Sequence, residues 1–178
     1  MCYPYTYTDQ RRFLCELETD ALRSRHVRKE VLSRTLAGNE CELLWVTDYT
    51  ASQAEIDTRR VVAVSARVHP GESNASWMMH GIIDFLTGRS AEADALRRHC
   101  LFLIVPMLNP DGVICGNYRC SLAAVDLNRR WSRPSAKLHP TVHALKKLLL
   151  RLHVRQPVAL YVDIQGHSRK QRTFMYGR

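Results

Sequence analysis

The sequence of 178 residues lacks any long apolar run. No stretch approaches the roughly 18 consecutive apolar residues that a membrane-spanning helix needs. The first residues, Met-Cys-Tyr-Pro-Tyr-Thr, also lack the basic segment followed by an apolar one that marks a secretory signal. We therefore expect a chain with neither a membrane span nor a membrane partner.

Paired cysteines are also missing. The six cysteines are scattered, and no two of them form a Cys-x-x-Cys pair. That pattern argues against zinc knuckles and against a small disulfide framework. Free thiols are typical of proteins kept in a reducing compartment, so the sequence predicts a cytoplasmic location.

Acidic residues are scarce in the second part of the chain. Residues 67–178 contain 17 Lys/Arg and 7 Asp/Glu, whereas residues 1–66 contain 9 and 10. A field of one sign attracts an oppositely charged partner, here an acidic one. The alternative is a solvated basic face without a partner. Nucleic acid is not expected, because the chain has no zinc finger, RNP-type aromatic strand or arginine-rich arm.

Composition and periodicity indicate one globular α/β fold. The apolar content of 46% and charged content of 24% are ordinary for a soluble domain. Apolar runs predict strands and amphipathic stripes predict helices, and their alternation predicts a mainly parallel mixed sheet with helices on both faces. The expected strands are 31–37, 41–47, 61–66, 101–105 and 158–164, the last three buried; the helices are 9–18, 73–86 and 140–153; the loops are 48–59 and 107–136.

Local signals predict where the elements begin and end. Thr8 or Asp9 is expected to cap the first helix, and Ser73 or Asn74 the second, which Gly88 would end. Gly38-Asn39 is a plausible turn between the first two strands, and Asn109-Pro110-Asp111-Gly112 is a strong turn signal. The inward stripe of the second helix is expected at Ala75, Met78, Met79, Ile82 and Leu86.

The motif His69-Pro70-Gly71-Glu72 directly follows the strand expected at 61–66. A histidine and a glutamate at this spacing can supply two zinc ligands, while a catalytic zinc needs a third and leaves one position open for water. Sites in α/β sheets form at the carboxyl ends of strands. Gln165 holds that position after the strand expected at 158–164, so the residues predict half a zinc site with an amide as third candidate.

Five motifs, taken in order, resemble the zinc metallocarboxypeptidases of the cytosolic carboxypeptidase branch, which includes tubulin deglutamylases. They are Arg67–Ser73, Pro106–Val113, Gly116–Cys120, Asp126–Arg129 and Asp163–Ser168. The resemblance implies a carboxypeptidase-like fold that is incomplete at its C-terminus. Residues 1–8 would end a preceding small β domain, and residues 9–178 would form the N-terminal part of the catalytic domain.

The resemblance also implies roles for single residues. His69 and Glu72 would bind one zinc ion, and Arg119 would stabilise the oxyanion of the reaction. Asn128 and Arg129 would hold the free terminal carboxylate of the substrate, for which a guanidinium supplies two parallel hydrogen bonds. His167 would contribute to substrate binding near the substrate channel.

Two departures from the family pattern bear on activity. Gln165 stands where the family has its third histidine, and an amide oxygen is a weak neutral zinc ligand, so the zinc would be weakly bound or absent. Rescue by His167 would need a backbone shift. The family's general-base glutamate would lie beyond Arg178, and Asp163 is expected to be a supporting or structural acid.

Two functions follow as expectations. The first is family chemistry, the hydrolytic removal of C-terminal residues, above all glutamates, from acidic protein tails such as those of tubulin. The second is a catalytically inactive relative or fragment that binds acidic tails without cleaving them. The first predicts zinc bound in roughly equimolar amount to the protein, and the second predicts salt-sensitive binding of a glutamate-rich peptide without release of free glutamate.

Overall fold

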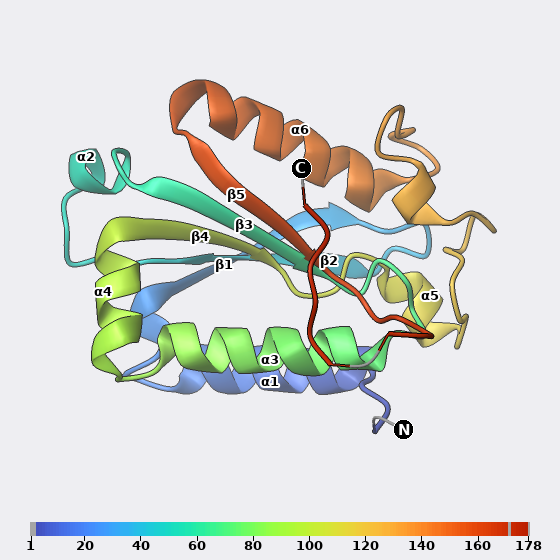
Figure 1. Ribbon diagram of the computed structural model, residues 1–178, viewed down its shortest axis with the longest axis horizontal. Helices are drawn as coiled ribbons and strands as arrows, with labels where there is room; N and C mark the ends of the chain where they lie inside the picture. Colours follow the sequence, from blue (N-terminus) through green and yellow to red (C-terminus); the bar gives the residue numbers. More distant parts are fainter. Residues whose placement is uncertain (1–2, 171, 178) are drawn as a thin grey trace.

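A five-stranded mixed sheet forms the centre of the molecule (Figure 1). The computed structural model describes residues 3–170 and 172–177. The strand order is β1-β2-β4-β3-β5, in which β4, β3 and β5 run parallel while β1 and β2 form an antiparallel hairpin. The strands are β1 (Val27–Arg34), β2 (Glu40–Val46), β3 (Arg60–Ala66), β4 (Cys100–Val105) and β5 (Val158–Ile164). The predicted α/β fold is confirmed.

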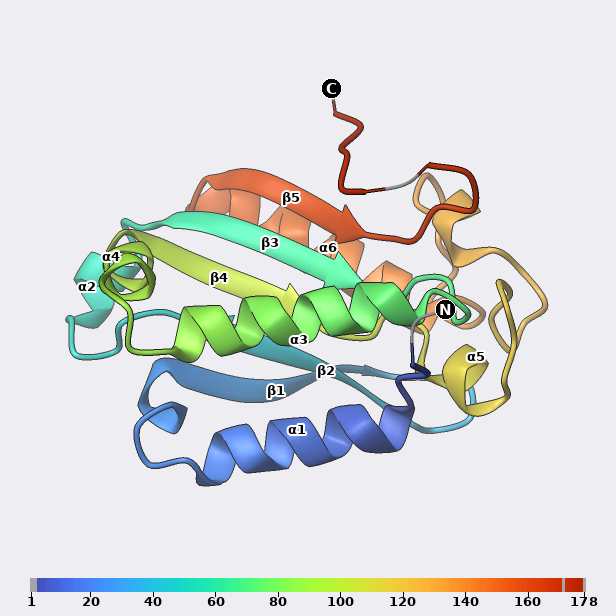
Figure 2. The same ribbon diagram turned by 60° about the horizontal axis from the view of Figure 1, so that its bottom comes forward.

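Helices cover both faces of the sheet, with α1 and α3 on one side and α6 on the other (Figures 1 and 2). Leu14 of α1 and Met79 of α3 pack in one core, and Leu145 of α6 packs in the second. The helices are α1 (Tyr7–Thr19), α2 (Gln53–Ile56), α3 (Ser73–Thr87), α4 (Ala91–His99), α5 (Pro110–Ile114) and α6 (Pro140–Arg155), with 3-10 turns η1 (Ser24–His26) and η2 (Leu127–Arg129). Helix α4 was not predicted, and α2, α5 and η2 lie in segments expected to be loops.

Helix α1 begins earlier than predicted. Its cap is Thr6, whose side chain accepts a hydrogen bond from the backbone N–H of Asp9 at 3.0 Å. The Asp9 carboxylate in turn accepts from the backbone N–H of Thr6, which completes a capping box. The predicted caps, Thr8 and Asp9, are therefore wrong, because the reciprocal pair forms one turn earlier.

Helix α3 also departs from the prediction at its start. Its N-cap is Glu72 rather than Ser73 or Asn74, and the Glu72 side chain makes no capping hydrogen bond. The inward stripe holds Ser76 and Ile83, whereas Met78 is 44% exposed. The predicted end is correct, since Gly88 is the C-cap.

Strand β5 is less buried than predicted. In the described part of the chain it pairs with β3 alone, so it forms one edge of the sheet. Leu160 is 52% exposed and Tyr161 is 38% exposed. The apolar run was interpreted as a strand covered on both faces, but an edge strand with few neighbours leaves such side chains partly in water.

The β1–β2 hairpin is fastened to α5 by Asp111. Gly38 adopts φ +82°, as the predicted turn requires. The Asp111 carboxylate accepts hydrogen bonds from Thr35 Oγ1 at 2.6 Å, from the N–H of Ala37 at 3.1 Å and from Asn39 Nδ2 at 2.9 Å. The motif expected to be a simple turn therefore also anchors a distant hairpin.

Three further expectations meet the structure only in part. Residues 1 and 2 of segment 1–8, and residues 171 and 178 of segment 9–178, lie outside the described residues, and the domain division stays a prediction. Cys2 lies outside them as well, while the five described cysteines are free thiols. In the described part of the chain, no helix combines the length and apolar character that crossing a bilayer requires.

Replacing Asp111 by Ala should lower the free energy of unfolding by about 2–3 kcal/mol, because Thr35 and Asn39 lose a buried charged acceptor. Urea titration followed by circular dichroism measures the change. The control is Asp57→Ala, at an exposed position with one side-chain partner, Gln53. Equal effects of the two substitutions would contradict the anchoring role of Asp111.

Candidate active site

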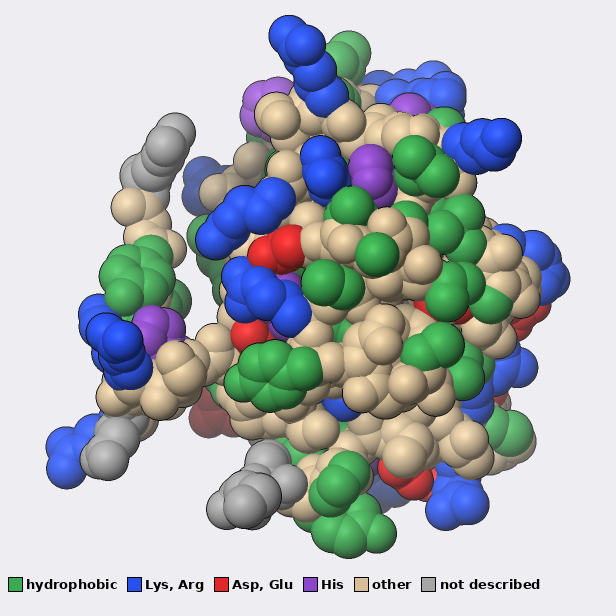
Figure 3. All heavy atoms as spheres, turned by 90° about the vertical axis from the view of Figure 1, so that its right-hand side faces the viewer, with side chains coloured by type: hydrophobic (Ala, Val, Ile, Leu, Met, Phe, Trp, Pro, Cys, Tyr) green, Lys and Arg blue, Asp and Glu red, His purple; other side chains and the backbone are tan. Residues whose placement is uncertain are grey.

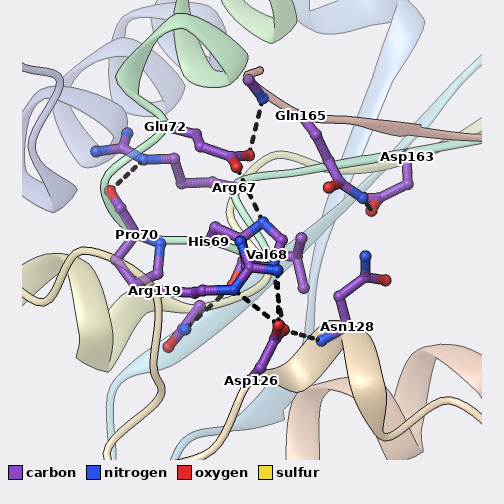
Figure 4. A network of polar contacts seen from close by, with 12 residues as sticks. Arg67, Val68, His69, Pro70, Glu72, Arg119, Asp126, Asn128, Asp163 and Gln165 are labelled. Carbon is purple, nitrogen blue, oxygen red and sulfur yellow. Dashed lines mark hydrogen bonds and ion pairs between the residues drawn. The ribbon is translucent and has the colours of Figure 1, made fainter. Parts of the chain in front are cut away.

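Three site residues predicted from the sequence, His69, Glu72 and Gln165, lie at the carboxyl ends of β3 and β5. The loop after β3 carries His69 and Glu72, the segment after β5 carries Gln165, and Asp126 comes from the connection that precedes α6 (Figure 4). Lys and Arg side chains gather on the upper part of this end of the molecule, on the α6 side, with acidic side chains in small patches between them (Figure 3). The parallel arrangement of β3 and β5 therefore brings distant motifs together, as predicted.

The imidazole of His69 lies between two carboxylates. Its Nδ1 is 3.0 Å from Oε1 of Glu72, and its Nε2 is 3.0 Å from Oδ1 of Asp126. The hydrogen bond with Glu72 raises the pKa of His69 above its usual value, against the opposing effect of burial. His69 is almost completely buried, at 2% exposure, so the two carboxylates fix the position of its ring.

Glu72 joins the ends of the two strands. Its Oε1 faces His69, and its Oε2 accepts a hydrogen bond of 2.8 Å from the backbone N–H of Gly166. This explains why Glu72 does not cap α3 with its side chain, since both oxygens are engaged elsewhere. A carboxylate held at both oxygens is oriented before any ligand arrives.

Asp126 connects three other residues of the site. One oxygen, Oδ1, faces His69 Nε2 and also accepts the backbone N–H of Asn128 at 2.9 Å. The other, Oδ2, accepts Nε and Nη2 of Arg119 at 2.9 and 2.8 Å. The Arg119 guanidinium, predicted to stabilise an oxyanion, is thus held in an ion pair with Asp126.

Gln165 turns toward Asp163 (Figure 4). Its Nε2 donates a 2.7 Å hydrogen bond to Oδ2 of Asp163, whose Oδ1 accepts from Ser65 Oγ at 2.6 Å. Burial raises the pKa of the Asp163 carboxyl above its usual value. Asp163 therefore acts as the supporting acid expected from the sequence, and the residue that it supports is Gln165.

The residues predicted to bind substrate differ in how many of their side-chain polar atoms are already hydrogen-bonded. Asn128 Oδ1 accepts a hydrogen bond from Trp131 Nε1 at 3.1 Å. Arg129 is exposed, and within the described part of the chain its side chain has no hydrogen-bond or ion-pair partner. His167 Nδ1 accepts the backbone N–H groups of Arg169 and Lys170, so the structure does not bring His167 into the network around His69.

Arg67 begins the first of the five motifs, and its side chain braces the loop that carries His69. It has a left-handed backbone, φ 58°, and is 3% exposed. Its Nε donates to the Pro70 carbonyl at 2.8 Å, and its Nη1 donates to the Tyr5 carbonyl at 2.9 Å and to Ser76 Oγ at 2.7 Å. A basic residue next to a zinc motif was visible in sequence, but its contact with Tyr5 joins residues 62 positions apart.

Close backbone packing completes the loop. A Cβ at Gly71 would lie 2.7 Å from the carbonyl oxygen of Tyr118, to which the Gly71 N–H already donates at 2.7 Å. A Cβ at Gly112 would collide with the ring of Pro70. Glycine is required at both positions because no side chain fits.

Comparison with protein families agrees with this geometry. The family model described as zinc carboxypeptidase matches residues 15–170, which is most of the chain. The chain belongs to the zinc carboxypeptidase family. This zinc carboxypeptidase chain is 45% identical to cytosolic carboxypeptidase 2 of Danio rerio over 176 residues, which are 99% of this chain and 24% of that protein. It is 47% identical to cytosolic carboxypeptidase 1 of Xenopus laevis over 98% of this chain and 15% of that protein. It thus spans about a quarter or less of these relatives.

Solved structures of metallo-carboxypeptidases share the fold. The enzyme from Burkholderia cenocepacia superposes with a TM-score of 0.80 at 29% identity, covering 92% of this chain and 42% of that one. The enzyme from Pseudomonas aeruginosa, in complex with (2-guanidinoethylmercapto)succinic acid, gives 0.76 at 30% identity over 92% and 40%. The carboxypeptidase-like fold expected from the sequence motifs is confirmed over this part.

The family name implies a zinc ion, and the residues fit one at two positions. Nδ1 of His69 faces Glu72 while Asp126 holds Nε2, which is how carboxylates orient histidine ligands of metals. The third position does not fit, because the Gln165 amide is bound to Asp163. Among the residues that the structure describes, no three His, Cys, Asp or Glu side chains form a metal site. His69 and Glu72 are thus candidates for two zinc ligands, and the described residues supply no third of these types.

Replacing Arg67 by Lys should lower the free energy of unfolding by about 2–4 kcal/mol, because one ammonium cannot reach the acceptors that the fork of Arg67 reaches. Urea unfolding measures this, and a changed NMR signal of His69 would report the moved loop. Arg98→Lys is the control, since Arg98 is exposed and pairs with Asp94. A stable variant with unchanged His69 signals would contradict the bracing role.

Proposed function

We propose that this chain recognises the free C-terminal carboxylate of acidic protein tails without cleaving them. The observation that carries the proposal is the contrast between two arginines. The Arg119 guanidinium is occupied by Asp126, whereas that of Arg129 is exposed and has no partner in the described part of the chain. A free guanidinium beside a site of this family suits an incoming carboxylate.

The neighbouring residues support the same role. Asp126, which contacts His69, also caps turn η2, and this turn carries Asn128 and Arg129. Asn128 keeps its amide Nδ2 for a ligand, because the one side-chain hydrogen bond it makes to described residues uses Oδ1. Arg129 would bind one carboxylate oxygen pair, and Asn128 Nδ2 would donate to the same group. His167 remains a candidate for contacts farther along the substrate.

The proposed substrate class rests on the basic charge of residues 67–178 and on sequence similarity to known proteins. Residues 67–178 carry an excess of Lys/Arg over Asp/Glu, which favours a glutamate-rich tail. Relatives at 45% and 47% identity are named cytosolic carboxypeptidases, so we also propose a cytosolic location and acidic protein tails, such as those of tubulin, as partners. Segments 1–8 and 9–178 are proposed to belong to a preceding small β domain and to the catalytic domain.

Hydrolytic release of terminal glutamates is the second candidate function. It is favoured by the 3.0 Å approach of His69 Nδ1 to Glu72 and by the contact of Asp126 with Nε2, which leave two ligands well oriented for zinc. The Gln165–Asp163 hydrogen bond opposes it. Binding without cleavage therefore stands first and hydrolysis second.

A glutamate-rich peptide with a free C-terminus should bind more tightly than the same peptide with a C-terminal amide. Arg129→Gln should abolish the difference, because its guanidinium would hold the carboxylate. Isothermal titration calorimetry measures binding, and an assay for free glutamate, with zinc added, measures cleavage. Arg89→Gln is the matched control, at an exposed position near the end of α3. Equal binding of both peptides would refute the proposal, and zinc-dependent glutamate release would favour hydrolysis.

Replacing Gln165 by His should raise the zinc affinity at least about tenfold, because imidazole is a stronger zinc ligand than an amide. Competition with a chromophoric chelator measures the affinity. Gln53→His, at an exposed position of α2, controls for adding a histidine anywhere. An unchanged affinity would show that Asp163, and not the amide, limits the site.

A further inference from the structure

A groove lies at the end of the molecule opposite the candidate active site. It has a volume of about 960 Å³, within the range of ligand sites. Its walls come from the last turns of α6, from β1 and β2 and from α2, and we call it the α6 groove. Its apolar and aromatic lining residues include Trp45, Tyr49, Ile56, Leu148 and Leu152. In Figure 1, α2 and the C-terminal end of α6 lie at the left, whereas α5 and the loops of the site lie at the right.

The floor of the α6 groove is aromatic and aliphatic. Trp45 and Tyr49 are only partly buried, and the Tyr49 hydroxyl donates to the Trp45 carbonyl at 3.3 Å, which fixes its ring. The outer surface of α6 continues this apolar surface, with Leu150 at 60% and Val154 at 86% exposure. Exposed apolar side chains next to an aromatic groove mark a surface for a partner.

Arginines border the α6 groove on both sides. Arg28 lies over the Tyr49 ring at 4.1 Å, and Arg151 and Arg155 project from α6. In the described part of the chain none of the three forms an ion pair. Two acids, Glu30 and Asp57, also line the groove, so three guanidinium groups leave a positive excess there.

We propose that the α6 groove binds an acidic protein segment that inserts apolar side chains between the arginines. Unpaired arginines attract carboxylates, and the aromatic floor gives buried area to the inserted side chains. A concave groove favours a peptide, because a bilayer surface would meet Leu150 and Val154 but would not fill the hollow behind them. The distance from the carboxylate site makes this a second recognition surface, independent of the chain end of the partner.

The test uses a labelled, glutamate-rich peptide with leucine at every third or fourth position. Its C-terminal amide excludes binding through Arg129. Fluorescence anisotropy should show binding that weakens with salt, and the double substitution R151E/R155E should reduce the affinity at least about tenfold. The control R12E/R89E changes the net charge equally at exposed arginines that do not line the groove. Circular dichroism confirms that each variant folds.

Five outcomes decide the proposal. Loss of binding in R151E/R155E but not in the control supports it, as does weaker binding when serine replaces leucine in the peptide. Equal loss in both variants would overturn it by showing non-specific attraction. Binding to anionic phospholipid vesicles that depends on Arg151 and Arg155, without peptide binding, would assign the surface to a membrane instead. Loss of peptide binding in Arg129→Gln alone would show that the peptide binds at the carboxylate site and not in the α6 groove, which would overturn the proposal.

Discussion

The buried guanidinium of Arg67 is the interaction on which the site depends. The chain leaves β3 through a left-handed residue, and that residue's side chain then holds the carbonyl of Pro70, three positions later. The same group holds Tyr5 ahead of α1 and Ser76 in α3. One side chain thus fixes the entry of the first helix, the loop of the metal motif and the start of α3. His69 and Glu72 are correctly placed because the loop between them cannot move independently.

Much of the scaffold could be predicted, because its determinants are local. Runs such as Val61–Ala66 and the leucines of α6 give their period directly, and Gly38 and Gly88 mark a turn and a helix end. Helix α4 escaped prediction because Ala91–His99 holds four charged residues and little apolar periodicity; its burial rests on Ala93 and Arg97. The exposure of β5 was missed because an apolar run does not reveal how many neighbours a strand has.

The candidate site, like the scaffold, could be predicted only in part from the sequence. His69, Glu72, Arg119 and Gln165 could be found from motifs, since each motif is short and ordered in the chain. The role of Asp126 could not, because its contact with His69 joins residues 57 positions apart. The bond between Gln165 and Asp163 was equally hidden, although the two residues are only two positions apart in the chain. The sequence therefore shows which residue types are present at this site, but the contacts between them can be seen only in the folded structure.

Asp126 links two candidate ligand-binding residues, His69 and Arg119. It contacts His69 with one oxygen and Arg119 with the other, so one carboxylate shares its charge between a candidate metal ligand and a candidate anion ligand. An anion that draws Arg119 away leaves Asp126 with more negative charge for His69, and a cation at His69 changes the hold on Arg119. The two binding equilibria are thus linked, and thermodynamics requires each to affect the other by the same factor. An anion bound at Arg119 and a cation bound at His69 would therefore be coupled through the single side chain of Asp126.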